Sequence, residues 1–278
     1  MTQKEFKATV GGKEITIKTG KYAQAANGSC IVQCGETVLL ATAVVSPYQR
    51  PGLNYFPLMV DYEEKLYAAG RIKGSRFIKR EGRPTDDAVL VGRFIDRAIR
   101  PLFDQRIKRD VQVIISMLAF DGEIDPDILG LIGASCAIHM SDIPWNGPIG
   151  GARISKLGEE WIVNPTYEQR AEADFDLDLA GTTEKTIMIE ARANEVAEDV
   201  MAEAFKRGSE SLAPVIKLIE EVQKAVGKEK DMTLAEPQTD EAKALVVHHE
   251  ELKKMAVEFM QPIYKKLCYD TPAMSKTA

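Results

Sequence analysis

Residues 68–103 read AAGRIKGSRFIKREGRPTDDAVLVGRFIDRAIRPLF, and they carry nine arginines and lysines in a chain whose net charge is −6. The first half, through Pro84, contains three glycines and no long apolar run, which predicts an exposed loop. The sequence Thr85-Asp86-Asp87 then predicts the start of a helix, because it places two carboxylates at the positive end of a helix dipole. This stretch therefore predicts a basic loop that leads directly into a helix.

The predicted helix has two distinct faces. Its apolar residues at helical spacing are Ala88, Val91, Ile95 and Ala98. Arg93, Arg97 and Arg100 fall on the opposite side at i, i+4 and i+7. Because Pro101 disfavours a helical conformation for the residue before it, Arg100 is expected at or just beyond the helix end.

A row of guanidinium groups beside a basic loop suits a phosphate-rich partner. Guanidinium groups bind phosphate oxygens in pairs, and an aromatic side chain such as Phe77 at the loop tip offers a face for stacking a base. The alternative is a solvated helix face that only balances nearby carboxylates. We favour phosphate or nucleic-acid contact, because loop and helix are contiguous and oppose the net charge of the chain.

The overall composition is that of an ordinary soluble protein, with 45% hydrophobic and 28% charged residues. The acidic net charge excludes a generally basic nucleic-acid coat, so a polyanion would bind only through a local patch. No apolar stretch reaches membrane-spanning length, and the N-terminus lacks a signal-peptide core, so no membrane partner is expected. The four cysteines lack zinc-type spacing, which favours buried thiols and a cytoplasmic location.

The order of predicted elements indicates an α/β or α+β sandwich rather than a strictly alternating array. Apolar alternation predicts strands within residues 6–19, 29–46, 57–62 and 111–120, and several more between 150 and 191. A small-residue apolar run predicts a core helix over 128–140, in which His139 is expected to be a core or boundary histidine. Two further helices are predicted over 195–206 and 211–226.

Three regions are predicted along the chain: a core domain over residues 1–226, a polar linker over 227–240 and a helical segment over 241–278. The last segment has little to pack against by itself, and SKTA provides no clear terminal cap. We therefore expect the chain to be part of a longer protein.

Three motifs carry a resemblance to a known family: FIKREGRPTDDAVLVGRFIDRAIRPLF, IGASCAIHMSDIPWNGPIGGARI and NPTYEQ followed by DFDLDLAGTTEKTIMIEA. Together they resemble the polynucleotide phosphorylase family, in its first ribonuclease-PH-like core. The tail from about residue 240 resembles the start of the all-helical domain of that family. The implied fold is a ribonuclease PH-like, ribosomal protein S5 domain 2-like core with mixed sheets and packed helices, followed by an incomplete all-α domain.

The resemblance implies a phosphorolytic 3′→5′ exoribonuclease that degrades mRNA. In that family, inorganic phosphate is the co-substrate, nucleoside diphosphates are released, and Mg²⁺ assists. The family assembles as a homotrimeric ring that admits single-stranded RNA, and a larger RNA-degradation complex is a possible partner. The residues expected from the family to bind RNA are Phe77, Ile78, Lys79, Arg80, Arg83, Arg93, Arg97 and Arg100.

The resemblance also implies that the chemistry lies in a second core, outside this chain. The family's catalytic core has a serine-rich phosphate loop before the core helix, whereas residues 125–130 here read DPDILG. The family's Asp, Asp and Lys positions read Arg170, Asp176 and Asp178, so only Asp176 matches. Asp174, Asp176 and Asp178 alternate and could contact a metal, but we favour an outward-facing strand edge. No catalytic or metal-binding residue is expected, and Mg²⁺ is assigned to the second core.

Two other interpretations remain open. The chain could act as a stand-alone, non-catalytic RNA-binding or assembly module. It could also be an unrelated metabolic α/β enzyme whose arginines bind a small phosphorylated substrate, although this would leave the contiguous basic loop and helix unexplained.

Overall fold

The computed structural model describes residues 3–49, 52–53, 55–72, 74, 82–236 and 240–269. The chain forms two compact units, Met1–Ala235 and Glu236–Ala278. The boundary between them falls inside the segment predicted as a linker. Among the helices of the described residues, none is long and apolar enough to cross a membrane.

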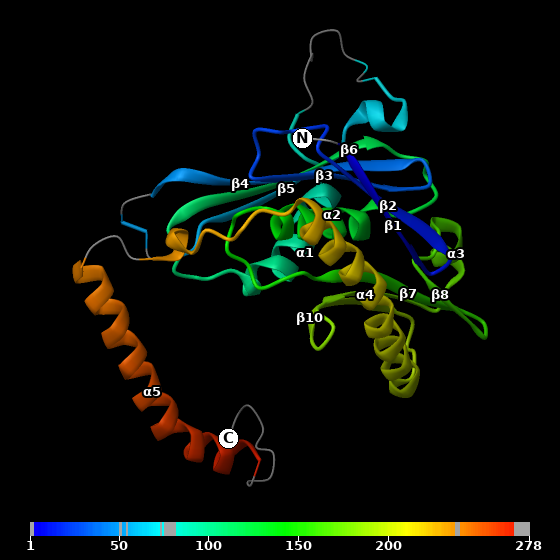
Figure 1. Cartoon of the computed structure of the whole chain (residues 1–278). Helices are drawn as coiled ribbons and strands as arrows, with labels where there is room; N and C mark the ends of the chain where they lie inside the picture. The colour runs from blue at the N-terminus through cyan, green and yellow to red at the C-terminus, as the bar shows by residue number, and fades with distance from the viewer. Residues whose placement is uncertain are drawn as a thin grey trace. The chain divides into compact units, whose positions relative to one another are not determined.

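The first unit contains a six-stranded mixed sheet (Figure 1). Its strands are β1 (Lys4–Val10), β2 (Lys13–Thr19), β3 (Gly28–Cys34), β4 (Thr37–Gln49), β5 (Leu58–Glu63) and β6 (Arg109–Ala119), in the order β1-β2-β3-β4-β6-β5. All neighbours are antiparallel except β5 and β6, which are parallel and are connected through α1 (Asp86–Ile99). A parallel pair needs such a crossover because a tight turn cannot join it.

A second sheet has four antiparallel strands in the order β10-β9-β7-β8. They are β7 (Gly150–Leu157), β8 (Glu160–Val163), β9 (Phe175–Gly181) and β10 (Thr186–Ala193). Helices α1 and α2 (Pro126–Met140) lie between the two sheets, since α2 contacts β3, β4, β6 and β7, and α1 contacts β5 and β10 (Figure 1). This layered arrangement places the N-terminus of α2 near β7.

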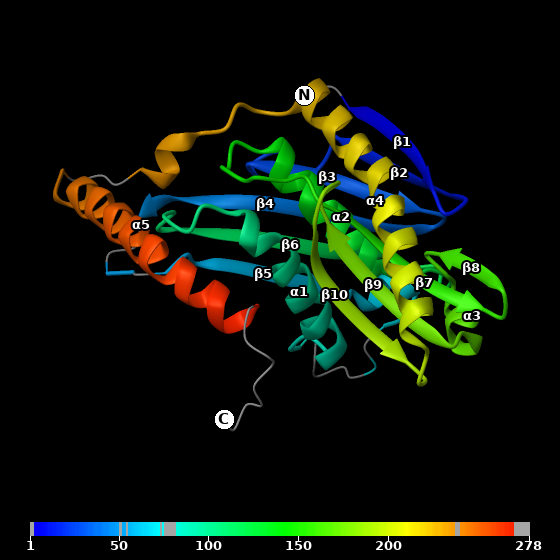
Figure 2. The ribbon, with the colours of Figure 1, turned by 90° about the horizontal axis from the view of Figure 1, so that it is seen from below.

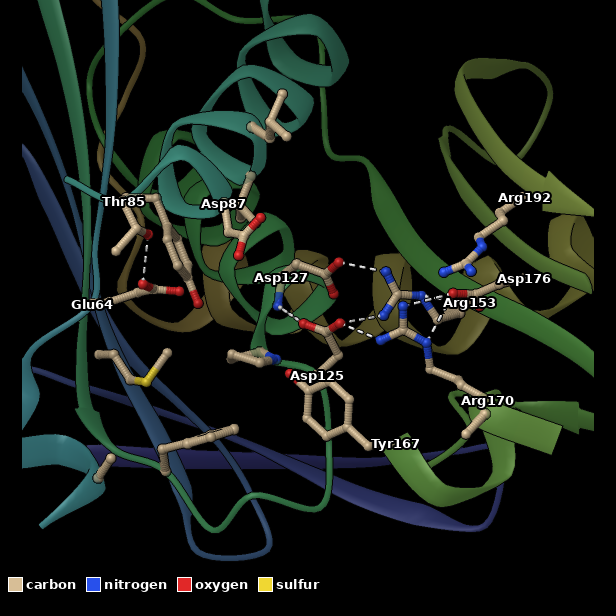
Figure 3. A pocket seen from close by; sticks show the side chains of 18 of the residues that line it. Glu64, Thr85, Asp87, Asp125, Asp127, Arg153, Tyr167, Arg170, Asp176 and Arg192 are labelled. Carbon is tan, nitrogen blue, oxygen red and sulfur yellow. Dashed lines mark hydrogen bonds and ion pairs between the residues drawn. The ribbon is translucent and has the colours of Figure 1, made fainter. Parts of the chain in front are cut away.

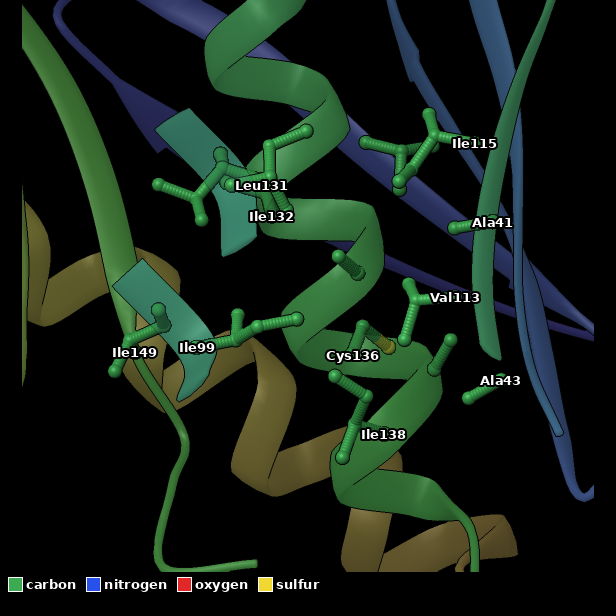
Figure 4. Packing of buried hydrophobic residues seen from close by; sticks show 14 of the residues in the cluster. Ala41, Ala43, Ile99, Val113, Ile115, Leu131, Ile132, Cys136, Ile138 and Ile149 are labelled. Atoms are coloured by element: carbon green, nitrogen blue, oxygen red, sulfur yellow. The ribbon is translucent and has the colours of Figure 1, made fainter. Parts of the chain in front are cut away.

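Helix α2 forms the centre of the hydrophobic core (Figure 4). Every residue of this helix except His139 is buried, so its pattern is apolar all round rather than amphipathic. Small residues allow the close approach that the sequence predicted: a Cβ added at Gly133 would lie only 2.9 Å from Ala41 Cβ. His139 lies at the boundary, where burial lowers its pKa to about 4.

Helix α4 (Glu198–Val226) runs without a break, so the prediction of two separate helices is wrong. Pro214 lies inside it, where a proline removes one backbone hydrogen bond. Buried Leu212, Val215 and Ile219 flank the proline, and the helix packs along β7, β9, β1 and α2 (Figure 2). Burial of this apolar stripe offsets the cost of the proline.

The segment that follows α4 is hydrogen-bonded to helix α2 of the same unit. Lys230 donates from Nζ to the carbonyl oxygens of Ile138, His139 and Ser141, at 2.9, 2.9 and 2.8 Å. These carbonyls lie at the C-terminal end of α2, where a cation is favourable. The short 3₁₀ helix η3 (Met232–Ala235) then closes the unit.

The second unit is described as a single helix, α5 (Asp240–Cys268). Its large apolar side chains, including Met255, Phe259 and Leu267, are exposed. Three cysteines, Cys30, Cys34 and Cys136, are buried free thiols as predicted, whereas Cys268 on α5 is exposed.

Candidate functional site

A cavity of about 790 Å³ opens in the first unit (Figure 3). Its walls come from the first turn of α1, the N-terminus of α2, strands β9 and β10, and the short helix α3 (Tyr167–Glu172). Helix α3 was not predicted from the sequence, although its capping box was available as a signal: Thr166 accepts from the Gln169 N–H, and the Gln169 side chain accepts from the Thr166 N–H.

The guanidinium of Arg153, on β7, lies at the back of this cavity and is only 4% exposed. It donates from Nε to Asp178 Oδ1 at 2.5 Å, from Nη1 to Asp125 Oδ2 at 2.6 Å and from Nη2 to Asp127 Oδ2 at 2.6 Å. Nη2 also reaches Asp178 Oδ2 at 2.8 Å. Three hydrogen-bonded carboxylates from two separate elements thus converge on one buried cation, and Asp176 Oδ1 lies 3.4 Å from its Nε as a fourth.

Arg170, on α3, extends this network. It donates from Nε to Asp176 Oδ2 at 2.8 Å and from Nη1 to Asp125 Oδ2, and its guanidinium lies 5.5 Å from the centre of the Tyr167 ring. We call Arg153, Arg170, Asp125, Asp127, Asp176 and Asp178 the arginine–aspartate cluster.

Asp176 and Asp178 lie on β9, which is an inner strand of its sheet. Their side chains are only 16% and 14% exposed and face the two arginines. The prediction of an outward-facing edge is therefore wrong for both residues. Asp174 precedes β9 and is exposed, as that prediction required.

The cluster contains more negative than positive charge, and its members respond differently. Burial opposes ionisation of Asp125, but Arg153 and Arg170 hold its pKa below its usual range. Burial, together with the neighbouring Asp125 carboxylate, raises the pKa of Asp127 well above its usual range. Burial likewise raises the pKa of Asp178. Protonation at Asp127 or Asp178 thus lowers the electrostatic cost of the cluster.

The same contacts occupy the N-terminus of α2, where an external anion could otherwise bind. Asp125 is the N-cap and accepts from the Asp127 N–H, and Asp127 accepts from the Ile128 N–H at 2.5 Å. The free N–H groups that would hold a phosphate are therefore satisfied by the protein's own carboxylates. This geometry agrees with the prediction that residues 125–130 form no phosphate cradle.

The cluster does not fit a divalent cation either. All four of its carboxylates are bonded to guanidinium groups, which already supply the positive charge. Within the described part of the chain, no group of three or more His, Cys, Asp or Glu side chains could hold a metal ion. No step of the chemistry is therefore assigned to Mg²⁺ in this unit.

The residues predicted to bind RNA fall into three groups. Phe77, Ile78, Lys79 and Arg80 lie outside the described residues. Arg83 is exposed just before α1, and Arg93 and Arg97 are exposed on one face of that helix.

Arg100, the last residue of the predicted row, has a different environment. It donates to both carboxylate oxygens of Asp96, at 3.0 and 2.8 Å, and to the carbonyls of Phe56 and Leu58, at 3.4 and 3.1 Å. These bonds join the end of α1 to the start of β5. They favour a structural role for Arg100, and its contact with RNA remains a prediction.

Comparison with known proteins identifies the class. The sequence patterns of the 3′ exoribonuclease family, domain 1 and domain 2, match residues 11–144 and 147–211. The chain belongs to this ribonuclease-PH-like family of 3′ exoribonucleases. The crystal structure of rice (Oryza sativa) Rrp46 has the same fold, with a TM-score of 0.61 at 13% identity over 77% of this chain and 96% of that one. The predicted fold class is thus confirmed.

Relatives at higher identity are named polyribonucleotide nucleotidyltransferase. That of Heliobacterium modesticaldum is 47% identical over 81% of this chain and 32% of the relative. Those of Anaeromyxobacter sp. (strain K) and Finegoldia magna are 44% and 43% identical over 86% and 91% of this chain, and 33% and 36% of the relatives. The resemblance identified from the sequence motifs is confirmed, and the chain spans about a third of the length of these relatives.

Replacing Arg153 should destabilise the fold strongly. In Arg153→Met, three buried carboxylates lose their common cation, so the free energy of unfolding should fall by about 3–5 kcal/mol in urea denaturation at pH 7. The matched control is Arg207→Met on α4, which breaks an exposed pair with Glu203 and removes the guanidinium 5.0 Å from the centre of the Trp161 ring, and it should cost no more than about 1 kcal/mol. Equal losses in the two variants would contradict the assigned importance of the cluster.

Asp127 should make the stability depend on pH. Its folded pKa is raised, so its favourable contribution is complete below the unfolded value of about 3.9 and is lost as pH rises through the folded pKa. Relative to Asp127→Asn, the wild type should therefore lose stability as pH rises from 4 through the folded-state pKa of Asp127. Urea unfolding at a series of pH values measures this difference. A difference that stays flat across this pH series for Asp127→Asn would refute the assignment.

Proposed function

We propose that this chain is the RNA-holding, non-catalytic first core of a phosphorolytic 3′→5′ exoribonuclease. The observation that carries the proposal is the arginine–aspartate cluster. In it, Asp125 and Asp127 accept hydrogen bonds from the N–H groups at the N-terminus of α2. Arg153 and Arg170 in turn donate to these carboxylates. Neither inorganic phosphate nor a divalent cation has a place there. Phosphorolysis of RNA requires that both attacking phosphate and developing charge be stabilised.

The chemistry then belongs to a second core, which also supplies the site for Mg²⁺ and for phosphate as co-substrate. The length of the relatives supports this division, because two thirds of each relative lies outside the match. The complete protein would degrade mRNA to nucleoside diphosphates in the cytoplasm, as a homotrimeric ring able to join a larger RNA-degradation complex.

Arg83, Arg93 and Arg97 are exposed and form what we call the basic face. This face is the part of the core that would hold single-stranded RNA. Arg93 and Arg97 lie on the exposed side of α1, and their side chains make no ion pair within the described residues. Arg83 precedes the same helix, and residues 77–80 precede Arg83 in sequence. Guanidinium groups without an internal partner remain available to phosphate oxygens.

The chain alone should not carry out phosphorolysis. We expect no ADP release from poly(A) when the 278-residue chain is incubated with inorganic phosphate and Mg²⁺, measured by chromatography of the soluble products. A full-length polyribonucleotide nucleotidyltransferase in the same buffer is the positive control. ADP release that stops when phosphate is omitted would overturn the non-catalytic assignment.

RNA binding should depend on salt through the free arginines of α1. Each phosphate contact to single-stranded RNA contributes roughly −0.7 to the slope of log affinity against log salt. Arg93→Ala and Arg97→Ala should each reduce that slope by about 0.7, as measured by fluorescence anisotropy with labelled oligo(A).

Two variants serve as controls for this measurement. Lys217→Ala removes an exposed charge from α4 and should leave the slope unchanged. Arg100→Ala should lower the free energy of unfolding, because its guanidinium is bonded to Asp96 and to the Leu58 carbonyl, and a reduced slope in this variant would add the predicted contact with RNA. If Arg93→Ala and Arg97→Ala both keep the wild-type slope, the assignment of RNA binding to the basic face fails.

A further inference from the structure

The segment 228–235, which we call the strap, leads from α4 to the end of the first unit (Figure 2). Two backbone hydrogen bonds attach it to the C-terminal end of α2. The Lys228 N–H donates to the Met140 carbonyl at 3.0 Å, and the Asp231 N–H donates to the Asp142 carbonyl at 2.8 Å. The first half of the strap is therefore fixed to the core through polar contacts.

The side chain of Lys230 makes the densest set of these contacts. An ammonium group has three N–H donors, and the carbonyl oxygens of Ile138, His139 and Ser141 lie 2.9, 2.9 and 2.8 Å from its Nζ. These carbonyls belong to the last turn of α2 and to its C-cap, where backbone carbonyls lack partners within the helix and attract a cation. Lys230 therefore caps α2 from outside the helix.

The strap buries little apolar surface of its own. Ala235 is buried and Leu234 is half-buried, whereas Glu229, Met232 and Thr233 are exposed. A segment with few buried apolar contacts can open locally at a lower cost than unfolding of the core. The closed position of the strap thus depends mainly on its hydrogen bonds.

The closed position also has a cost for the ammonium of Lys230. Burial lowers the pKa of Lys230 to about 8, although the Asp142 carboxylate acts in the opposite direction. The three acceptors are neutral carbonyls, and burial lowers the pKa of His139 to about 4, so its imidazole is neutral near pH 7. Lost hydration therefore offsets part of what the three hydrogen bonds contribute, which lowers the cost of opening the strap.

We propose that the strap is a latch that opens without unfolding of the core, and that Lys230 holds it closed. In the closed state the first unit extends to Ala235. In the open state residues 228–235 join the connection to the second unit and add up to about 26–29 Å of extended chain. Lys230 then controls how far the second unit can move from the first. This device is separate from RNA binding, because none of its residues belongs to the basic face.

Hydrogen exchange of single amides in the 278-residue chain, followed by NMR, tests the latch. Lys230→Met keeps an unbranched side chain but removes the ammonium. The Lys228 and Asp231 amides, which donate to carbonyls at the end of α2, should then exchange about tenfold faster or more. The Ile132 amide, in the middle of α2, should keep its wild-type rate. Unchanged exchange at Lys228 and Asp231 would overturn the proposal.

Two further variants separate a latch from a general loss of stability. Glu229→Gln changes an exposed charge of the strap and should exchange as the wild type does. Lys228→Met removes one side-chain bond, to the Asn27 carbonyl at 2.7 Å, and should accelerate the Asp231 amide less than Lys230→Met does. If Lys230→Met accelerates the amides of α2 as much as those of the strap, the core is destabilised as a whole and Lys230 is a cap without being a latch.

The reach of the second unit can be measured separately with spin labels. Cys268 on α5 is exposed and the other three cysteines are buried, so α5 carries a native site for a thiol-reactive label. Lys217→Cys places a second label at an exposed position of α4. Adding Lys230→Met should broaden the distance distribution between the labels, measured by pulsed electron paramagnetic resonance, and extend it to longer distances. An identical distribution in both proteins would show that Lys230 does not control the reach.

Discussion

The buried guanidinium of Arg153 is the constraint around which the first unit is arranged. A charge this deeply buried is tolerated only with full hydrogen bonding, and its partners come from both halves of the fold. Asp125 and Asp127 belong to the segment that matches domain 1 of the family, whereas Arg153 and Asp178 belong to the segment that matches domain 2. The cluster therefore couples the core helix to the second sheet by electrostatics as well as by apolar packing.

The cluster has a chemical consequence beyond stability. A helix N-terminus attracts anions, and a set of carboxylates attracts cations, so this cleft has the parts of both an anion site and a metal site. Here each part satisfies the other: the carboxylates cap α2, and the arginines neutralise the carboxylates. The side chains of this cleft therefore satisfy one another's charge and hydrogen-bonding capacity.

Much of the fold could be predicted from the sequence because the apolar period is local information. Alternation identified the strands of both sheets, and the small-residue run 128–140 identified the core helix, which the structure extends to Pro126–Met140. The cluster was missed because Arg153 lies 28, 26 and 25 residues from Asp125, Asp127 and Asp178, and no periodicity links such positions. The break predicted at residues 207–210 was wrong because α4 continues through them, where buried Gly208 allows close packing against Leu179 and Ile154.

The arginines of α1 show the limit of a pattern even where the helix is predicted well. Arg93, Arg97 and Arg100 fall on one face of the helix, yet within the described part of the chain only the first two are exposed and without an ion-pair partner. The last reaches the end of the helix, where Asp96 and two carbonyls near β5 are within bonding distance. Spacing determines which face a side chain occupies, whereas the neighbouring elements determine whether its charge is still free.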